Sequence, residues 1–268
     1  MKCLNCNSTE YKKKFRSYND VDYIICKECE CHYQNQIIKE NYDDSYWDGG
    51  VDPDGIKRIC TDEKDIKFRA KNFYGDSINV VNKNKNIKVL DVGCGLGWFI
   101  GSLNSSIEKH AIDESQFVVD YIRNNFKDIN ITKGNINDVD NLNHKFDIIM
   151  FYHVIEHLEF PTKSIEILRN KLKNDGLLIV GTPNIGSLFS KFFGKNYRLY
   201  KADHVCLYNL NALKLLMKKN NFYIERIEKP FFRTEYNNLK NFLRLFNPKK
   251  ISPPFYNSIV TLYCRKRI

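Results

Sequence analysis

The sequence predicts an α/β protein built on a doubly wound, mostly parallel sheet, with a small cysteine-rich module in front of it. Segments with the patterns of strands and helices alternate over most of the chain, which is typical of a parallel sheet covered on both faces. A glycine-rich turn, "VGCGLGW", follows the first of these strands, and two Cys-x-x-Cys pairs lie near the start of the chain. With 268 residues, the chain is long enough for one main domain and a small appendage.

The cysteines define the first module. Cys3 and Cys6 form one pair, Cys26 and Cys29 form the other, and nineteen residues separate the two pairs. Short strand-like pieces, "YKKKFRS" and "DYIIC", lead to the second pair. Four thiolates at this spacing are typical of a structural zinc ribbon, because four protein ligands leave no open position for water. Cys31 is a spare thiol that could replace one of the four ligands.

The main domain follows an aromatic, acidic joint and a charged helix over residues 62–81. Its predicted strands are short apolar runs bounded by turn residues: 87–92, 110–115, 129–135, 146–154, 176–184 and 222–228. Its predicted helices have apolar residues at helical spacing: 115–126, 161–172 and 209–220. We expect Pro161 in the first turn of its helix and Asn209 as a helix cap.

The glycine turn predicts a ligand that lies against bare backbone. Gly93, Gly95 and Gly97 occupy alternate positions, where a side chain would collide with a closely bound group. A dinucleotide site needs G-x-G-x-x-G, but here the third glycine falls one residue early and bulky Trp98 takes the last position. Asp91 lies just before the loop and would repel a phosphate. It suits a cationic ligand group such as an ammonium.

A second acid completes the description of the ligand. Asp113 ends the next predicted strand in "AIDES", twenty-two residues after Asp91. A carboxylate at the end of the second strand can accept hydrogen bonds from both hydroxyls of a ribose. A ribose and an ammonium without a diphosphate describe S-adenosylmethionine, which we therefore expect as the cofactor.

Four motifs resemble, in order, those of the class I S-adenosylmethionine-dependent methyltransferases: "VLDVGCGLGW", "AIDES", "GNINDV" and "FDIIMFYHVIEHLEFP". The resemblance covers about residues 64–268 and is closest to the small-molecule branch of that family. It implies a Rossmann-like sheet of seven strands that ends in an antiparallel hairpin. Residues 222–228 and 257–266 fit the last two strands.

The resemblance and the cysteine pattern divide the chain into three parts. We expect a zinc-ribbon-like module over residues 1–45, a linker with an N-terminal helical segment over residues 46–85, and a methyltransferase domain over residues 86–268. We expect two substrate-loop insertions, at residues 185–203 and 229–256. The second insertion could wall the substrate pocket or pack as a lid, and packing is the role we favour.

The resemblance also implies the cofactor-binding residues. At the methionine end of the cofactor these are Asp91, Gly93, Cys94, Gly95 and Gly97. Asp113 is expected at the ribose, Asn135 and Ile136 beside the adenine, and Tyr152 and His153 beside the sulfonium. The family's usual acid near the adenine is Asn135 in this chain, and Asp138 follows three residues later, so either side chain could meet the ring nitrogen.

Histidines are the candidate catalytic residues, because a neutral imidazole can take a proton from an acceptor hydroxyl. His204 lies in "DHVCLYN", which resembles a segment of the deoxysugar methyltransferases, enzymes that also carry an N-terminal zinc module. We expect His204 to be the general base, with His153 as the second candidate. His153, Glu156 and His157 spell H-x-x-E-H, but this run overlaps the methyltransferase motif, so we expect no metal there and a hydrogen-bonding role for His157.

The acceptor is expected to be a small molecule. Residues 185–201 interleave aromatic and basic side chains, a mixture suited to stacking on a ring and pairing with phosphate. This favours methylation of a hydroxyl of a nucleotide-activated sugar or a surface-glycan precursor. An RNA methyltransferase that docks ribosomal RNA through the zinc ribbon is the first alternative. A noncatalytic partner protein that binds zinc and S-adenosylmethionine is the second.

Composition indicates which kind of surface and which cellular location to expect. The formal net charge is +10, but lysines are spread over the whole sequence, which favours a solvated surface over a dedicated polyanion site. The chain has no signal-peptide pattern and no apolar run of the roughly 18 residues that a membrane span needs. We therefore expect a cytoplasmic protein with reduced thiols. The oligomeric state stays open.

Overall fold

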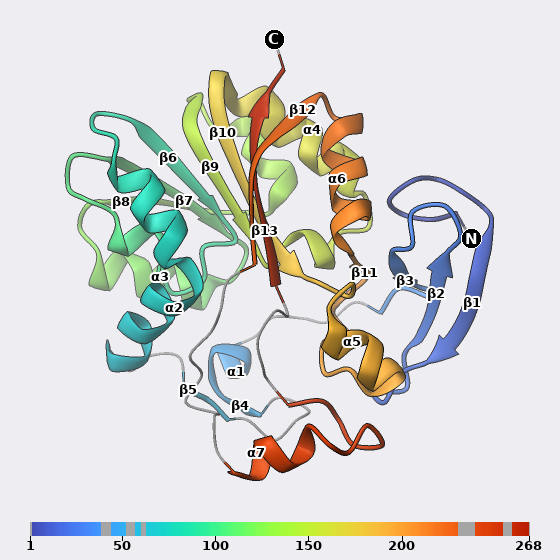
Figure 1. The fold of residues 1–268 in the computed structure, drawn as a ribbon. Helices are drawn as coiled ribbons and strands as arrows, with labels where there is room; N and C mark the ends of the chain where they lie inside the picture. Colours follow the sequence, from blue (N-terminus) through green and yellow to red (C-terminus); the bar gives the residue numbers. More distant parts are fainter. Residues whose placement is uncertain are drawn as a thin grey trace.

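A seven-stranded sheet lies at the centre of the protein (Figure 1). The computed structural model describes residues 2–38, 44–51, 57–59, 63–229, 239–253 and 259–267. The strands of the sheet are β6 (Lys88–Val92), β7 (Glu108–Asp113), β8 (Ile129–Lys133), β9 (Phe146–Tyr152), β10 (Leu172–Pro183), β12 (Phe222–Glu228) and β13 (Ile259–Lys266). Their order is β12-β13-β10-β9-β6-β7-β8. Strands β6 to β10 are parallel, and β13 is antiparallel to both of its neighbours. The predicted doubly wound, mostly parallel sheet is confirmed.

Two layers of helices cover the sheet. Helices α2 (Glu63–Asn82) and α3 (Gln116–Asn125) lie on one face, and α4 (Pro161–Lys171) and α6 (Leu210–Lys219) lie on the other (Figure 1). Strand β9 shows why: Ile148 and Met150 pack into the hydrophobic cluster that includes α3, whereas Ile149 and Phe151 pack into the cluster that includes α4 and α6. A strand buried on both faces reads as a continuous apolar run in the sequence.

Helix boundaries follow local capping chemistry. The Asn209 side chain accepts a hydrogen bond from the Ala212 amide at 2.8 Å and caps α6, and Pro161 begins α4. Ser115 caps α3 by accepting from the Val118 amide. Both expected boundary residues, Pro161 and Asn209, therefore hold their predicted positions, because each satisfies or avoids an unpaired amide of the first helical turn.

The cysteine-rich module is joined to the main domain through a shared sheet. Its strands are β1 (Tyr11–Arg16), β2 (Asp22–Cys26) and β3 (His32–Gln34), and the short strand β11 (Cys206–Leu207) pairs antiparallel with β3. The Asn5 side chain also donates to the Ala212 carbonyl of α6 at 3.1 Å. The pairing of β3 with β11 could not be predicted from the sequence, because a strand of two residues is too short to show the alternation of apolar and polar residues.

Short elements fill the remaining described segments. The linker forms α1 (Asp44–Trp47) and the hairpin of β4 (Asp48–Val51) and β5 (Lys57–Ile59), and the first predicted insertion forms α5 (Leu188–Phe193). Short 3-10 helices follow three of the strands, η1 (Ile100–Ser102) after β6, η2 (Ile136–Asn141) after β8 and η3 (Ile155–His157) after β9, whereas η4 (Gly194–Asn196) follows helix α5. The second predicted insertion contains α7 (Leu239–Arg244), and its residues 230–238 and 254–256 lie outside the described residues.

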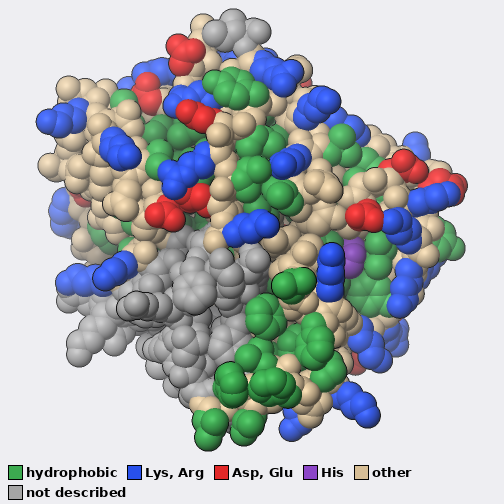
Figure 2. Space-filling model, in the orientation of Figure 1, with side chains coloured by type: hydrophobic (Ala, Val, Ile, Leu, Met, Phe, Trp, Pro, Cys, Tyr) green, Lys and Arg blue, Asp and Glu red, His purple; other side chains and the backbone are tan. Residues whose placement is uncertain are grey.

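The surface carries mixed charge. Lys and Arg side chains are spread over the visible face, with Asp and Glu among them (Figure 2). This distribution agrees with a solvated surface rather than one basic stripe. Among the described helices, none has the length and apolar character that crossing a membrane requires.

Candidate cofactor cavity and metal centre

A cavity of about 620 Å³ opens at the carboxyl ends of β6, β7 and β9 and is called the first cavity below. Five of the predicted cofactor residues line it: Gly93, Asp113, Asn135, Ile136 and His153. The other five are not among its lining residues: Asp91, Cys94, Gly95, Gly97 and Tyr152. The predicted set is therefore split between the wall of the cavity and the layer that supports it.

The glycine loop leaves no room for side chains. Gly93, Gly95 and Gly97 all have positive φ angles, between 51° and 79°. A Cβ atom added at Gly93 would lie 2.5 Å from the Val154 side chain, and one at Gly97 would lie 2.7 Å from Ile122 of α3. Side chains are therefore excluded here both by backbone conformation and by space. Gly93 keeps the cavity wall bare, whereas Gly97 lets the loop pack on α3.

Two buried carboxyl groups lie behind this loop. The carboxylate of Asp113 accepts hydrogen bonds from the amides of Gly95 and Ser115, both at 3.0 Å. Burial raises the pKa of Asp113. Burial and the nearby charge of Asp113 raise the pKa of Asp91 to about 8. No cationic side chain in the described part of the chain forms an ion pair with Asp91, so the site favours a ligand that brings a positive charge.

Asn135 occupies the position beside the expected adenine. Its side chain accepts from the Asn137 amide at 2.9 Å and caps η2, and its own amide donates to the Asp138 carboxylate at 2.9 Å. Asn135 lines the first cavity, whereas Asp138 does not. The Asp138 carboxylate instead holds the loop through this capping box.

Trp47 covers the glycine loop from α1. A Cβ atom added at Gly95 would lie 3.1 Å from the Trp47 ring, and the Trp47 and Trp98 rings have centroids 6.4 Å apart. Trp47 and Tyr46 line the first cavity. The indole N–H of Trp47 is buried and has no hydrogen-bond partner among the described residues, which suggests that a ligand or water accepts from it. Trp47 was not among the predicted cofactor residues, although the aromatic run "SYW" at residues 45–47 is a local signal for it.

His153 enters the first cavity from the end of β9. Its φ angle of 56° is left-handed, and its amide donates to the Gly181 carbonyl at 2.8 Å. Its Nδ1 lies 3.1 Å from the Glu156 carboxylate. Non-glycine residues adopt such a backbone rarely, and the surrounding hydrogen bonds hold it in place.

Glu156 fixes the proton on the His153 ring. Its other carboxylate oxygen accepts from the Thr182 hydroxyl at 2.9 Å, and the side chain is fully buried. Burial alone would raise the pKa of Glu156, but the hydrogen bond from His153 and three nearby imidazoles lower it to about 2. An ionised carboxylate only accepts hydrogen bonds, so Nδ1 of His153 carries the hydrogen and Nε2 is left as an acceptor.

His204 lies in a buried cluster next to this pair. Its Nδ1 donates to the Leu199 carbonyl at 2.7 Å, and its ring lies 5.0 Å from that of His157. His157 in turn donates to the Asp203 carbonyl at 2.9 Å, which agrees with the expected hydrogen-bonding role. Burial lowers the pKa of His204 to about 4. His157 lines the first cavity, whereas His204 is not among its lining residues.

Tyr152 and Cys94 support the cavity from behind. The Tyr152 hydroxyl accepts from Thr261 at 3.3 Å, and its ring fills the space beside Gly181, where an added Cβ would lie 2.0 Å from the ring. Both Tyr152 and Cys94 are buried. Burial raises the pKa of each, so both side chains stay neutral and act through packing.

The four paired cysteines meet at one point of the module. The sulfurs of Cys3, Cys6, Cys26 and Cys29 lie within 4.8 Å of one another. Cys31 lies just outside this set, with its sulfur 3.3 Å from those of Cys3 and Cys29. Four convergent thiols are a donor set that suits a tetrahedral metal ion.

The strand order and the bare glycine corner define a Rossmann-like methyltransferase fold. A solved methyltransferase from Archaeoglobus fulgidus has this fold, with a TM-score of 0.55 and 20% identity over 76% of this chain and 98% of its own. The plantazolicin methyltransferase BamL, solved with a substrate analogue and SAH, has a TM-score of 0.53 and 16% identity over 76% of this chain and 90% of its own.

The family follows from the sequence. A family model described as a methyltransferase domain matches residues 67–227, more than half of the chain. The chain therefore belongs to the methyltransferase domain family.

Two curated relatives match shorter segments. A probable S-adenosylmethionine-dependent methyltransferase of Mycobacterium tuberculosis is 26% identical over 98 residues, which are 36% of this chain and 35% of the relative. A ubiquinone biosynthesis O-methyltransferase of Rickettsia bellii is 30% identical over 108 residues, which are 38% of this chain and 45% of the relative. The matches thus span less than half the length of these relatives.

Proposed function

We propose that the chain transfers the methyl group of S-adenosylmethionine to a hydroxyl of a nucleotide-activated sugar or surface-glycan precursor. The observation that carries the proposal is the first cavity, which is lined by the bare backbone of Gly93, the carboxyl group of Asp113 and the partly exposed side chain of His153. The family of the chain and the SAH in a solved protein of the same fold support the choice of cofactor.

The residues around the first cavity fit S-adenosylmethionine. Asp113 still has acceptor capacity beyond its two amide donors, which suits ribose hydroxyls. Asp91 lies buried behind the loop with a raised pKa, so a positively charged ammonium near it relieves the cost of its burial. The unpaired indole N–H of Trp47 offers one further donor. A diphosphate would meet two buried carboxyl groups here.

His153 is the base in this proposal. When bound, S-adenosylmethionine supplies an activated methyl group, so the protein has only to place the acceptor and remove its proton. Nε2 of His153 accepts the hydroxyl proton, while Glu156 holds Nδ1 and stabilises the resulting imidazolium. His204, which the sequence analysis expects to be the base, becomes the second candidate in this proposal, because the residue is only 6% exposed and does not line the first cavity.

The acceptor class is supported by the segment that follows β10. Tyr197 and Tyr200 of this segment are buried, while Lys191 and Lys195 are exposed beside them. An aromatic support with exposed cations suits a ring that carries phosphate. One relative is described as an O-methyltransferase, which agrees with a hydroxyl acceptor.

We also propose that the four-cysteine cluster holds one structural zinc ion. Four thiolate ligands close the coordination sphere, so this metal would stabilise the module without taking part in methyl transfer. The strands of the module have only three to six residues each, and metal binding would supply much of their folding free energy.

Tryptophan fluorescence tests the cofactor assignment, because the chain has two tryptophans, Trp47 and Trp98, and both lie at the glycine loop. S-adenosylmethionine should change the emission saturably. Gly93→Ala should weaken binding by about tenfold or more, since its Cβ would meet Val154 on a strained backbone. Gly194→Ala is the matched control, because Gly194 also has a positive φ but nothing lies within 4 Å of its added Cβ.

Three results would each contradict a part of the proposal. If the wild type and Gly93→Ala bound S-adenosylmethionine with equal affinity, the cofactor would not lie against the glycine loop. Saturable binding without methyl transfer to any nucleotide-activated sugar would favour the noncatalytic alternative, and methyl transfer to ribosomal RNA under the same conditions would favour the RNA alternative.

A further inference from the structure

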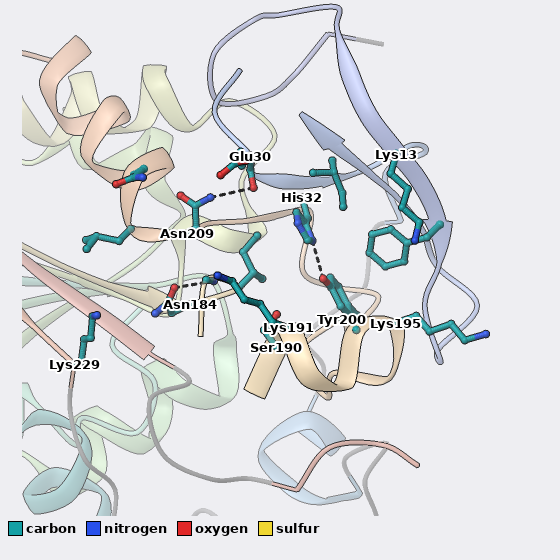
Figure 3. Close-up of a pocket in the computed structure, with 17 residues that line it drawn as sticks. Lys13, Glu30, His32, Asn184, Ser190, Lys191, Lys195, Tyr200, Asn209 and Lys229 are labelled. Atoms are coloured by element: carbon teal, nitrogen blue, oxygen red, sulfur yellow. Dashed lines mark hydrogen bonds between the residues drawn. The ribbon is translucent and has the colours of Figure 1, made fainter. Parts of the chain in front are cut away.

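A second cavity, of about 650 Å³, lies where the cysteine-rich module meets the main domain (Figure 3). Strand β1 contributes Lys13 and Phe15 to it, and β3 contributes His32. The segment after β10 contributes Lys191 and Tyr200 from the opposite side. The cavity therefore exists only because the module and the main domain are held together.

The second cavity is strongly basic. Its lining includes Lys13, Lys191, Lys195 and Lys229, and one acid, Glu30. Glu30 is already paired with Lys12 outside the cavity, and none of the four lining lysines has an ion-pair partner among the described residues. Lys191 extends from α5 toward Asn184, whereas Lys195 points away at the rim (Figure 3). The unbalanced positive charge indicates an anionic ligand.

One wall of the second cavity is aromatic and rigid. The rings of His32 and Tyr200 are stacked at an interplanar angle of 1°, and Nδ1 of His32 lies 2.7 Å from the Tyr200 hydroxyl. Phe15 packs edge-on against both rings, at centroid distances of 5.8 Å and 5.2 Å. Phe15 is only partly buried, so it can support a planar group of a ligand.

The floor of the second cavity supplies polar groups. Asn184 and Asn209 lie there, and the next residues, Leu210 and Asn211, bring the first turn of α6 to the cavity. A helix N-terminus has unpaired amides and a partial positive charge, which add to the attraction of the lysines for phosphate.

A single segment connects the two cavities. Asp203 and Val205 line the first cavity, and Asn209 lines the second, with β11 between them. Strand β10 makes the same connection, because Gly181 accepts from the His153 amide and Asn184 follows three residues later. A ligand held in the second cavity is thus attached to the same elements that place His153.

We propose that the second cavity binds the nucleoside diphosphate part of the acceptor, with the diphosphate at Lys13 and Lys191 and the base against Phe15. The inference rests on the proposed function, since it names the handle by which a nucleotide-activated sugar is held. It gives the cysteine-rich module a role in substrate binding.

Calorimetric titration with ADP, GDP, CDP, UDP and dTDP tests the inference, with S-adenosylmethionine affinity measured on the same samples. At least one nucleoside diphosphate should bind. Lys13→Gln and Lys191→Gln should each weaken that binding by about tenfold, because each removes a charge-assisted contact to phosphate. Lys14→Gln is the matched control, since Lys14 neighbours Lys13 on β1 but lies over the Tyr11 ring. Phe15→Leu should weaken nucleotide binding but spare inorganic pyrophosphate.

The outcomes separate this inference from the proposed function. S-adenosylmethionine binding without binding of any nucleoside diphosphate overturns the inference and leaves the cofactor assignment intact. Equal losses in Lys13→Gln and Lys14→Gln also overturn it, because they would show general surface attraction. A third outcome also overturns the inference. If a single-stranded oligoribonucleotide binds in a way that depends on the lysines, and no nucleoside diphosphate binds, then the ligand of the second cavity is RNA. Loss of S-adenosylmethionine binding in wild type would reject the proposed function itself.

Discussion

We expect Asp91 to couple cofactor binding to proton release. Burial and the charge of Asp113 raise its pKa to about 8, so the carboxyl group is mainly protonated in the unliganded protein at neutral pH. An ammonium beside it favours the ionised form and lowers the pKa, so the proton leaves as the cofactor binds. At pH 7, binding of S-adenosylmethionine should release close to one proton per chain. Calorimetry in phosphate and in Tris, which differ in ionisation enthalpy, measures this number.

The control for this prediction is Asp91→Asn, which keeps the size of the side chain and removes its titration. The variant should bind the cofactor more weakly and release no proton. Proton release of the same size in the variant would assign the effect to another group, of which Asp113 is the nearest candidate because its pKa is also raised.

Substitution of His153 and substitution of His204 should have different effects. His153→Ala should lower kcat by about a hundredfold or more, which is the usual contribution of a general base, while S-adenosylmethionine affinity changes little. His204→Ala should lower the melting temperature, because it opens a space beside His157 and leaves the Leu199 carbonyl unpaired. The two variants are compared by turnover and by thermal unfolding.

The variant Glu156→Gln tests whether Glu156 acts by holding the His153 ring hydrogen on Nδ1. An amide can donate to Nδ1 of His153, which would move the ring hydrogen to Nε2 and remove the acceptor. The acidic limb of the pH–rate profile should therefore shift, with the KM for the acceptor little changed.

The comparison of the two histidine variants could also give the opposite result. If His204→Ala folds but has lost turnover, while His153→Ala is still active, then His204 is the base.

At the scale of elements, the module concentrates five thiols at one end of its sheet. Four sulfurs converge, and Cys31 lies beside Cys3 and Cys29 but also faces Cys206 of β11. Cys29→Ser should lose most of the bound zinc, whereas Cys31→Ser should keep one ion per chain. Metal analysis of the purified variants measures the ratio. Loss of zinc in Cys31→Ser and its retention in Cys29→Ser would make Cys31 the fourth ligand.

The elements that the sequence predicts well are those with strong local signals. Strand β9 is a continuous apolar run, and α6 has both a capping Asn209 and apolar residues at helical spacing, so each was found with nearly its final boundaries. The glycine loop could be predicted equally well, because the positive φ angles at Gly93, Gly95 and Gly97 favour glycine over other residues, so the bend is marked in the sequence.

The rest depends on contacts between distant residues. Helix α1 has four residues and no helical pattern, so the cover that Trp47 provides over Gly95 could not be read from sequence. The pairing of β11 with β3 brings His32 near Tyr200, 168 residues away. The distinction between His153 at the cavity and His204 behind it also arises only when β9 and the segment before β11 come together.

At the scale of the whole molecule, the module packs against residues 185–207 of the main domain. Val21 and Tyr23 of the module share a buried cluster with Tyr197 and Leu207 of the main domain. The Tyr23 hydroxyl lies 2.8 Å from the carbonyl oxygens of both Lys201 and His204, and these two acceptors share its one hydrogen. The glycine corner belongs to a separate cluster formed with α2 and α3. The module supplies Lys13, Phe15, Glu30 and His32 to the second cavity, but only Ile37 and Ile38 to the first. Loss of the module should therefore disturb the second cavity more than the first.

Removal of the metal tests this division of roles. A strong chelator should unfold the module if the proposed zinc ion supplies much of its folding free energy, and should weaken binding of the nucleoside diphosphate by at least about tenfold. The Trp47 and Trp98 fluorescence change with S-adenosylmethionine should persist, because the strands below the glycine loop keep their own core. Added zinc should restore nucleotide binding and turnover together. Unchanged nucleotide binding in the metal-free protein would contradict a supporting role for the module, and simultaneous loss of both ligands would show that the module and the main domain unfold as one cooperative unit.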